Sequence, residues 1–356
     1  MKPFIFTLFL FISIVAVNAQ TAIEVPTTQK SLVTKHTATW CPICGTSESW
    51  DLQQYFVDNL DGKNAVVLSA HQSTTSKLYS KAGKDLLANF QNAVYQPEFF
   101  FNTTKLSGNE EAIKAEVIAK VNQAATQTAV VQTGLKATYI TSTDSLVVVT
   151  KTKFFQAATG EYRLAILLVE KVVEETQASR TGLQAHKRIV RKTLTPDVTG
   201  VVLSNGAVAA NVEFNSNFSI KWNNQYNLNN IEIVTLIWKR NTTTNKLEFV
   251  NTNEITQLQQ ATTATQKVDF LANRFVITPN PVREQTQIRL DLLQAYNSAE
   301  IVLMDIKGAV VKTLHRGNLN SGAQTIEVNR NLIANGLYFV RLRADGQTAT
   351  RKVIFQ

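Results

Sequence analysis

The spacing of hydrophobic residues changes once along the chain, near residue 129. Before that point, segments with apolar residues on one helical face alternate with short runs of β-branched and aromatic residues. The predicted strands are 31–39, 64–71 and 95–102, and the predicted helices are 45–60, 76–91 and a segment from 108 onward. Strands and helices that alternate in this way predict an α/β domain.

After residue 129 the apolar runs become short, β-branched and partly alternating, which is typical of an antiparallel β-sandwich. A stretch rich in Thr, Gln and Asn then predicts a linker, and seven short strand-like runs predict a last, small all-β domain. The expected segments are a targeting peptide 1–19, an α/β domain 20–128, a β-sandwich-like domain 129–250, a linker 251–274 and an all-β domain 275–356.

The first segment has the pattern of a secretory signal peptide. Lys2 precedes an uncharged apolar run shorter than the ~20 residues that span a bilayer comfortably, and Val17-Asn18-Ala19 fits a signal-peptidase site. We expect cleavage after Ala19, the alternative being an uncleaved anchor. No cysteine follows the run directly, which excludes a lipoprotein anchor. No later stretch predicts a transmembrane span, so the mature chain is expected to be soluble or surface-attached. The signal peptide predicts that it lies outside the cytoplasm.

The formal net charge is +9, but the basic residues are dispersed along the chain. The densest basic stretch, 186–192, is interpreted as the solvated face of one strand rather than as a binding patch. Because the sequence has no motif that combines stacking aromatic residues with basic ones, it gives little support to nucleic-acid binding.

The chain has only two cysteines, Cys41 and Cys44, in the sequence Trp40-Cys-Pro-Ile-Cys44. A disulfide that closes so short a loop adds little stability, and disulfides persist outside the cytoplasm. We therefore interpret the pair as reactive rather than structural. Its predicted position at the start of a helix would stabilise a thiolate. We expect Cys41 to be the more exposed and the more acidic thiol.

This arrangement resembles the thioredoxin-like superfamily, in which a cysteine pair follows a strand and a proline precedes a later strand. The matching residues are Trp40, Cys41, Pro42, Cys44 and Pro97. The resemblance implies that Cys41 is the nucleophile and that Cys44 resolves the mixed disulfide. It also implies that a cis Pro97 presents the backbone of Gln96 to a substrate. Trp40, Gln96 and Pro97 are therefore the expected substrate-binding residues.

One position departs from that family. Thioredoxins have a buried acid six residues before the first cysteine, and this chain has Lys35 there. We expect the lysine side chain to extend to solvent; the alternative is that its charge lowers the pKa of Cys41. His36 and His71 are expected to be exposed or hydrogen-bonded strand histidines.

Two further resemblances cover the rest of the chain. Residues 31 to about 270 resemble the Bacteroidetes outer-membrane-protein family of nominal 28-kDa size, through segments 35–44 and 186–192. Residues 275–356 resemble the type A sorting domain of the type IX secretion system. The residues that carry this resemblance are Pro279-Asn-Pro281, Asp305-Ile-Lys-Gly308, segment 332–340 and Lys352-Val-Ile-Phe-Gln356. The resemblance implies export through the periplasm, removal of the domain, and release or attachment at the cell surface.

The sequence thus predicts a thioredoxin-like α/β domain, an all-β sandwich-like domain and a sorting domain. The favoured function is a surface thiol–disulfide oxidoreductase that acts on protein disulfides or dithiols and is delivered by the type IX machinery. The alternative is a non-catalytic binding module on the same scaffold. No cofactor is expected, because two cysteines cannot build a closed zinc site, although Cys41, Cys44 and His36 could form a partial one.

Overall fold

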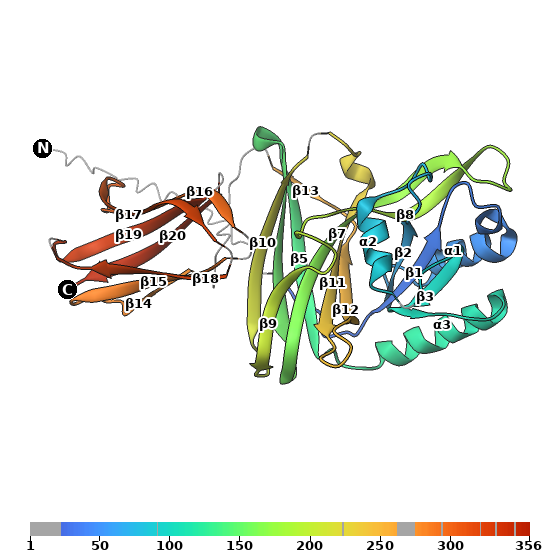
Figure 1. Ribbon diagram of the computed structural model, residues 1–356, viewed down its shortest axis with the longest axis horizontal. Coiled ribbons are helices and arrows are strands. Elements are labelled where there is room, and N and C mark those ends of the chain that lie inside the picture. The colour runs from blue at the N-terminus through green and yellow to red at the C-terminus, as the bar shows by residue number, and fades with distance from the viewer. Residues whose placement is uncertain are drawn as a thin grey trace, which may run out of the picture.

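The computed structural model describes residues 23–90, 92–222, 224–261, 275–292, 295–320, 322–331, 333–344 and 347–356. These residues form a mostly β protein with few helices and four sheets (Figure 1). The predicted signal peptide and residues 262–274 of the predicted linker lie outside the described residues. None of the described helices is long and apolar enough to cross a membrane.

The first block contains all three α-helices of the described chain. In chain order its elements are β1 Ser31–Thr37, α1 Ser47–Asn59, β2 Ala65–His71, α2 Lys81–Ala88, β3 Glu98–Phe101, β4 Thr104–Lys105 and α3 Glu110–Ala125. β1 lies at the centre, parallel to β2 on one side and antiparallel to β3 on the other. Both strands are buried on both faces. The sequence of β2 is accordingly apolar or small up to its last residue, whereas β1 also buries Lys35 and His36.

The alternation of β1 side chains separates two cores. Val33 faces α1 and α3, where Phe56 and Val117 are fully buried against β2 and β3. Leu32 faces the opposite side, where Leu86 of α2 packs beside strands of the second block. A one-residue shift of this strand would exchange the two sets, so the register of β1 is strongly specified.

The second block is a β-sandwich, as predicted. Its strands are β5 Val131–Ile140, β6 Ser145–Phe154, β7 Ala158–Thr176, β8 Leu183–Thr193, β9 Val201–Val208, β10 Glu213–Lys221, β11 Ile231–Arg240, β12 Leu247–Ile255 and β13 Gln259–Ala261. One layer is the sheet β10-β6-β5-β13. Its apolar face packs on β7 and β11 through a core that includes Phe154, Leu164 and Ile233. Residues 251–255 of the predicted linker complete β12 instead.

One sheet joins the two blocks. Its strand order is β12-β11-β7-β8-β2-β1-β3-β4, and β9 pairs with β7. The junction is a parallel contact between Ser69 of β2 and Ile189 of β8. The boundary predicted at residue 128 falls between α3 and β5, but the sheet continues across it. The second block therefore adds strands beside the first block, and Figure 1 shows the long β7 and β8 reaching toward β2 and α2.

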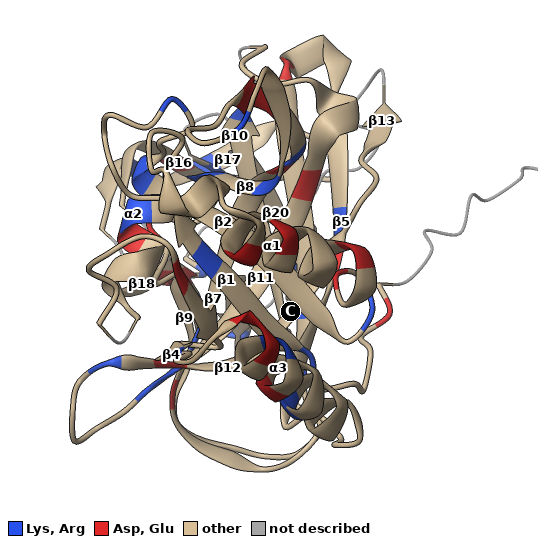
Figure 2. Cartoon of the chain, turned by 90° about the vertical axis from the view of Figure 1, so that its right-hand side faces the viewer, with Lys and Arg blue, Asp and Glu red and all other residues tan. Residues whose placement is uncertain are grey.

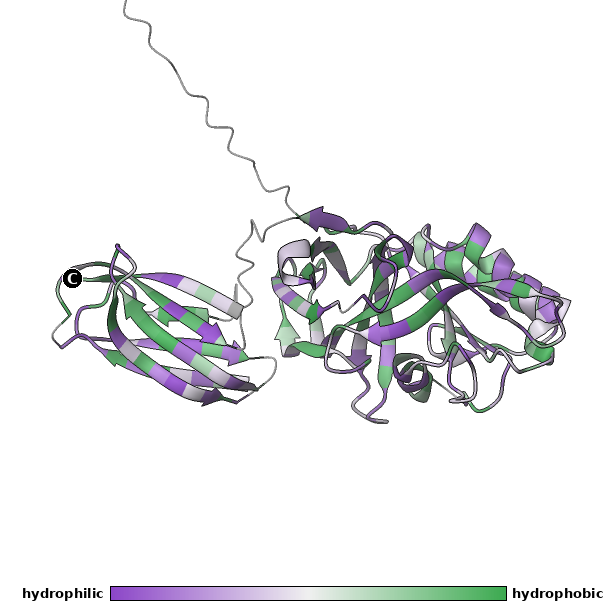
Figure 3. Cartoon of the chain, turned by 90° about the horizontal axis from the view of Figure 1, so that it is seen from above, coloured by the Kyte–Doolittle hydropathy of each residue, from purple (hydrophilic) through white to green (hydrophobic). Residues whose placement is uncertain are grey.

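The last block is all-β, with strands β14 Phe275–Thr278, β15 Gln285–Leu292, β16 Tyr296–Met304, β17 Val310–Leu319, β18 Gly322–Asn329, β19 Gly336–Ala344 and β20 Gln347–Phe355. They form the sheets β14-β15-β18 and β17-β16-β19-β20. The two sheets enclose one core, with Phe275, Ile301 and Phe355 among its most buried residues. Figure 3 shows apolar and polar residues alternating along these strands, as a sandwich requires.

Candidate functional site

The two cysteines lie just after β1, and they form a disulfide whose Cα atoms are 5.3 Å apart. A short 3₁₀ turn, Ile43–Gly45, contains the second cysteine. The backbone N–H of Cys44 donates to Sγ of Cys41 over 3.2 Å. This N–H therefore points at the sulfur of Cys41. Cys41 is 3% exposed and Cys44 is fully buried, in agreement with the expected order of exposure.

The helix that follows starts later than the sequence predicts. Thr46 is extended, with φ −65° and ψ 160°, and α1 begins only at Ser47. The cysteines therefore precede the regular helix instead of occupying its first turn. The close approach of another segment accompanies this break, since a Cβ atom added at Gly45 would lie 2.0 Å from the carbonyl oxygen of Ala178. Stabilisation of a Cys41 thiolate thus depends on the local N–H of Cys44 more than on the dipole of α1.

That other segment is the tip of the β7–β8 hairpin, residues 177–182, which we call the hairpin tip. The side-chain amide of Gln177 donates to the carbonyl of Cys41 over 2.8 Å. The N–H of Ala178 donates to the carbonyl of Thr39 over 2.8 Å, and Nε of Arg180 donates to the carbonyl of Gly45 over 2.9 Å. A segment about 135 residues away in sequence thus holds three carbonyls of the cysteine loop.

Lys35 corrects an expectation. Its side chain does not extend to solvent, because it is only 2% exposed and lies beneath the cysteine turn. Nζ donates to the carbonyls of Cys44 and Ser49 over 3.2 and 3.0 Å, and it lies 5.7 Å from the ring centroids of Trp50 and Phe99. Burial, helped by the charge of Arg180, lowers the pKa of Lys35 to about 7.

Histidines also line this buried region. Nδ1 of His36 lies 3.6 Å from the Glu98 carboxylate, and Nδ1 of His71 is hydrogen-bonded to the Ser76 hydroxyl over 2.8 Å. His186 of β8 packs edge-on against Trp50, with ring centroids 4.9 Å apart. Burial lowers the pKa of all three imidazoles, that of His186 to about 4. At neutral pH these histidines are therefore uncharged.

The basic stretch 186–192 also differs from its interpretation as a solvated face. His186 and Arg188 are 4% and 3% exposed, because β8 is an inner strand of the joined sheet. This burial could not be deduced from the sequence, since the neighbours of β8 come from both blocks. Figure 2 shows both basic and acidic positions on α2 and α3, whereas the charged positions of α1 are all acidic.

The structure brings the downstream proline loop to the cysteines. The Gln96–Pro97 peptide bond is cis, and the carbonyl oxygen of Gln96 lies 3.6 Å from Sγ of Cys41. Apolar side chains with high exposure occur in the cysteine loop and just before Gln96. They are Trp40, Ile43, Val94 and Tyr95, which we call the apolar rim. Nε1 of Trp40 donates to the Ser73 hydroxyl over 3.2 Å, which holds its exposed ring in place.

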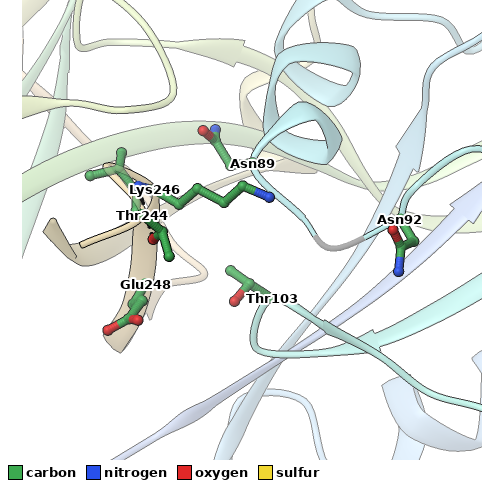
Figure 4. Close-up of a pocket in the computed structure, with 7 residues that line it drawn as sticks. Asn89, Asn92, Thr103, Thr244, Lys246 and Glu248 are labelled. Carbon is green, nitrogen blue, oxygen red and sulfur yellow. Dashed lines mark hydrogen bonds between the residues drawn. The ribbon is translucent and has the colours of Figure 1, made fainter. Parts of the chain in front are cut away.

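A separate pocket lies away from the cysteine loop, between the end of α2, the β3–β4 turn and the β11–β12 hairpin (Figure 4). Its volume is about 370 Å³, and its lining is mostly polar: Asn89, Asn92, Thr103, Thr244, Lys246, Leu247 and Glu248. None of the residues predicted for the site borders it. Among the described residues, no group of three or more His, Cys, Asp or Glu side chains is arranged to hold a metal ion.

Comparison with known proteins places the C-terminal block. Residues 276–356 match the secretion system C-terminal sorting domain. This is a type IX sorting domain. It shows that the chain is secreted or delivered to the outer-membrane surface through the type IX machinery, as the sequence predicted. No curated protein sequence matches the chain.

Among solved structures, the chain is similar to HBP35 of Porphyromonas gingivalis, with a TM-score of 0.55 and 16% identity, over 93% of this chain and 99% of that one. At this identity the likeness shows the fold alone. Two weaker likenesses do not define the fold. One is to a protein from Agrobacterium tumefaciens (TM-score 0.42, 14% identity, 67% and 97% covered). The other is to a domain of the outer membrane lipoprotein Omp28 from P. gingivalis (TM-score 0.25, 14% identity, 37% and 92% covered).

Proposed function

We propose that this protein is a surface thiol–disulfide oxidoreductase with a thioredoxin-like first domain. The strand order β2-β1-β3-β4, with β1 and β2 parallel and β3 antiparallel, supports this assignment. So does the placement of α1 and α3 on one face and α2 on the other. We also infer that the chain is related to the 28-kDa outer-membrane-protein family, because an α/β block followed by a β-domain is the arrangement that this resemblance implies. On this proposal the domain bounds are 20–128 and 129–250.

The observation that supports a redox role best is the meeting of three groups at Cys41. Its sulfur is bonded to Cys44, accepts the N–H of Cys44, and lies 3.6 Å from the carbonyl oxygen of Gln96. A purely structural disulfide needs neither a backbone donor nor a neighbouring unpaired backbone edge. In the proposed site, Cys41 is catalytic and the Gln96–Pro97 backbone lies beside an incoming chain.

The proposed reaction is thiol–disulfide exchange. In the reducing direction, the Cys41 thiolate attacks a substrate disulfide and forms a mixed disulfide, and Cys44 then attacks Sγ of Cys41 and releases the substrate. The apolar rim suits an extended polypeptide with apolar side chains, because Trp40 and Tyr95 present rigid aromatic area beside the sulfur. Backbone groups of Gln96 can hydrogen-bond to such a chain whatever its sequence.

The test is a thiol-trapping titration of the mature protein across glutathione redox buffers. We expect the pair to cycle between disulfide and dithiol. We also expect Cys44→Ser to retain a covalent partner from a surface extract, because resolution is lost while attack by Cys41 survives. Cys41→Ser/Cys44→Ser is the matched control and should capture nothing. A pair that is never reduced, together with no capture by Cys44→Ser, would disprove the oxidoreductase proposal.

A non-catalytic binding module is the second candidate, and two observations favour it. Both sulfurs are almost fully buried, and the polar pocket between α2 and the β11–β12 hairpin is large enough to hold a small ligand. In that case the disulfide would only fix the loop, and the double serine variant would keep all surface binding. Surface binding that survives in a protein without measurable redox cycling would support this candidate.

We further propose that the mature protein lacks residues 1–19 and about 270–356. The signal-peptidase pattern at Ala19 supports the first cleavage, and the sorting domain at 276–356 supports the second. Intact-mass measurement of protein released from the cell surface tests both. A surface product that still contains Phe355-Gln356 would contradict the second cleavage.

A further inference from the structure

Lys35 is a buried cation that no carboxylate neutralises directly. Its ammonium donates to the carbonyl of Cys44 and to that of Ser49 in α1. Among the ion pairs of the described residues, none within 4.0 Å includes Lys35. A buried charge without a counter-ion is costly. An anion that formed near Lys35 would therefore be stabilised by it. The Cys44 sulfur belongs to the residue whose carbonyl the ammonium contacts.

A second cation, Arg180, also lies close to the ring of Trp50. The guanidinium of Arg180 lies 4.9 Å from the ring centroid of Trp50, and Lys35 lies 5.7 Å from it. Arg180 is paired with Asp51, whose side chain is 59% exposed and therefore solvated. The other ionisable neighbours are the buried, uncharged His71 and His186, and His36 with its partner Glu98 on the adjacent strand β3. The Glu98 carboxylate is already paired with Lys105 over 2.6 Å. The charges nearest the cysteine turn are thus mainly positive.

We propose that Lys35 is a positioning residue that stabilises the thiolate of Cys44, so that the Cys41–Cys44 disulfide acts as an oxidant of substrate dithiols. This inference rests on the proposed redox function and adds its direction. A stabilised thiolate favours the reduced form of the pair, and a disulfide whose reduced form is favoured is a stronger oxidant. A neutral or acidic residue at this position would not have this effect.

The reaction balances without a further reagent for one turnover. A substrate thiolate attacks Sγ of Cys41, the Cys41–Cys44 bond breaks, and its electron pair leaves on Cys44, the residue whose carbonyl Lys35 contacts. The second substrate thiolate then attacks the substrate sulfur of the mixed disulfide and releases the Cys41 thiolate. Two electrons pass from the substrate dithiol to the pair. The two protons lost by the substrate thiols pass to solvent or to the released thiolates. Because a more stable leaving thiolate departs faster, Lys35 accelerates the first step.

The experiment measures the equilibrium constant between the protein pair and glutathione for the wild type, Lys35→Met and Lys35→Gln. Both variants remove the charge; the methionine is close in shape, and the glutamine keeps a donor for the buried carbonyls. We expect each to disfavour the reduced form by about tenfold, which corresponds to about 30 mV. The rate at which glutathione reduces the disulfide should fall with it. Lys84→Met removes an exposed lysine of α2 and should change neither value.

Lys35→Arg separates charge from shape, because it keeps the cation. It should hold the equilibrium constant closer to the wild type than either neutral variant does. The proposal is overturned if folded Lys35→Met and Lys35→Gln keep the wild-type constant, or if Lys35→Arg changes it as much as they do. A wild-type protein that cannot be reduced at any glutathione ratio would instead remove the proposed function, and this inference with it.

Discussion

Two buried basic residues lie in the same nine-stranded sheet, and they differ in the number of carboxylates around them. Arg188 of β8 is surrounded by carboxylates: Nε lies 3.0 Å from Asp61, and the two Nη atoms pair with Glu232 and Glu254. Lys35 of β1 contacts only carbonyl groups and aromatic rings. The first cation has an excess of negative charge around it, and the second has almost none.

The difference separates a structural role from a functional one. The Arg188 cluster links the segment after α1 to β8, β11 and β12, so it connects the two blocks where the sheet joins. Its carboxylates are present whatever the state of the cysteine pair. The field at Lys35, in contrast, has no fixed anion to neutralise it. On the proposal above, a thiolate formed by reduction of the cysteine pair would supply the missing anion; otherwise the charge is lost only when Lys35 itself releases its proton, with a pKa of about 7. Excess positive charge beside a reactive sulfur indicates chemistry, whereas a saturated cluster indicates architecture.

The largest expected effect is loss of the structural cation. Arg188→Met leaves three buried carboxylates without their partner, so we expect the free energy of unfolding to fall by about 3–5 kcal/mol. Arg188 also has φ +61° within a strand, which is a left-handed conformation. In the wild type the contacts of the guanidinium hold this strained backbone, and a methionine would have to adopt it without those contacts. Chemical unfolding followed by tryptophan fluorescence measures this, because all four tryptophans precede residue 275.

The neighbouring Lys187→Met is the matched control for Arg188→Met. Lys187 pairs with Asp58, whose side chain is 58% exposed, so its loss should cost at most about 1 kcal/mol. Equal stability losses for the two variants would contradict the contrast between the buried cluster and the surface pair.

The functional cation should behave in the opposite way. Burial lowers the pKa of Lys35 from 10.5 to about 7, so the unfolded chain binds the proton more tightly. Between about pH 7 and about pH 10.5 the free energy of unfolding then rises with pH because of this group, and below that range the full penalty of the buried charge remains. Lys35→Met removes the penalty. We expect the variant to be more stable than the wild type at about pH 6, because the buried charge is gone. The gain is limited to roughly 1–3 kcal/mol, since the two hydrogen bonds of the ammonium are lost as well.

The measurement for Lys35→Met is the stability difference from the wild type as a function of pH. The difference should shrink as pH rises toward about 10.5. Lys84→Met should show no such trend, because that lysine is exposed. A difference that stays constant over this range would show that Lys35 keeps an ordinary pKa and that its burial is compensated in a way the contacts do not indicate.

The sequence predicted the local parts of the site well. Strand β1, the cysteine turn and the strand after Pro97 follow from short-range patterns of apolar and turn residues. The position of Gln96 beside Cys41 was expected only from the resemblance to the thioredoxin-like superfamily. The seven strands of the sorting domain follow from alternation and turn residues in the same way. The start of α1 was misplaced because the docking of the hairpin tip at Gly45 cannot be deduced from the helical pattern.

The buried charges could not be predicted, because they depend on pairings between distant segments. Lys35 donates to the carbonyl of Ser49 in α1, and the backbone pairing that brings β8 beside β2 joins Ser69 to Ile189 across about 120 residues of sequence. A lysine near a strand centre is ordinarily exposed, and no residue close to Lys35 in sequence suggests otherwise. Arg188 likewise gains its partners from three separate segments. The residues that distinguish this site from a generic cysteine pair are therefore the ones that required the structure.

The smallest expected effect tests which charge dominates within the Arg188 cluster. Burial, helped by Glu254 and opposed by Arg188, raises the pKa of Asp61 from 3.8 to about 7. The unfolded carboxyl loses its proton first, so this group makes the free energy of unfolding fall as pH rises from about 4 to about 7.

Asp61→Asn stays neutral, and its amide oxygen can still accept the N–H of Val67, as the carboxylate does over 2.7 Å. We expect the stability of this variant relative to the wild type to rise with pH across that range. Asp58→Asn, which alters the exposed pair with Lys187, should gain nothing. If the free energy of unfolding of the wild type instead rises relative to that of Asp61→Asn between about pH 4 and about pH 7, Asp61 is ionised in the folded protein. Its attraction to Arg188 then outweighs its burial, and the cluster is a balanced ion network rather than one with an excess of negative charge.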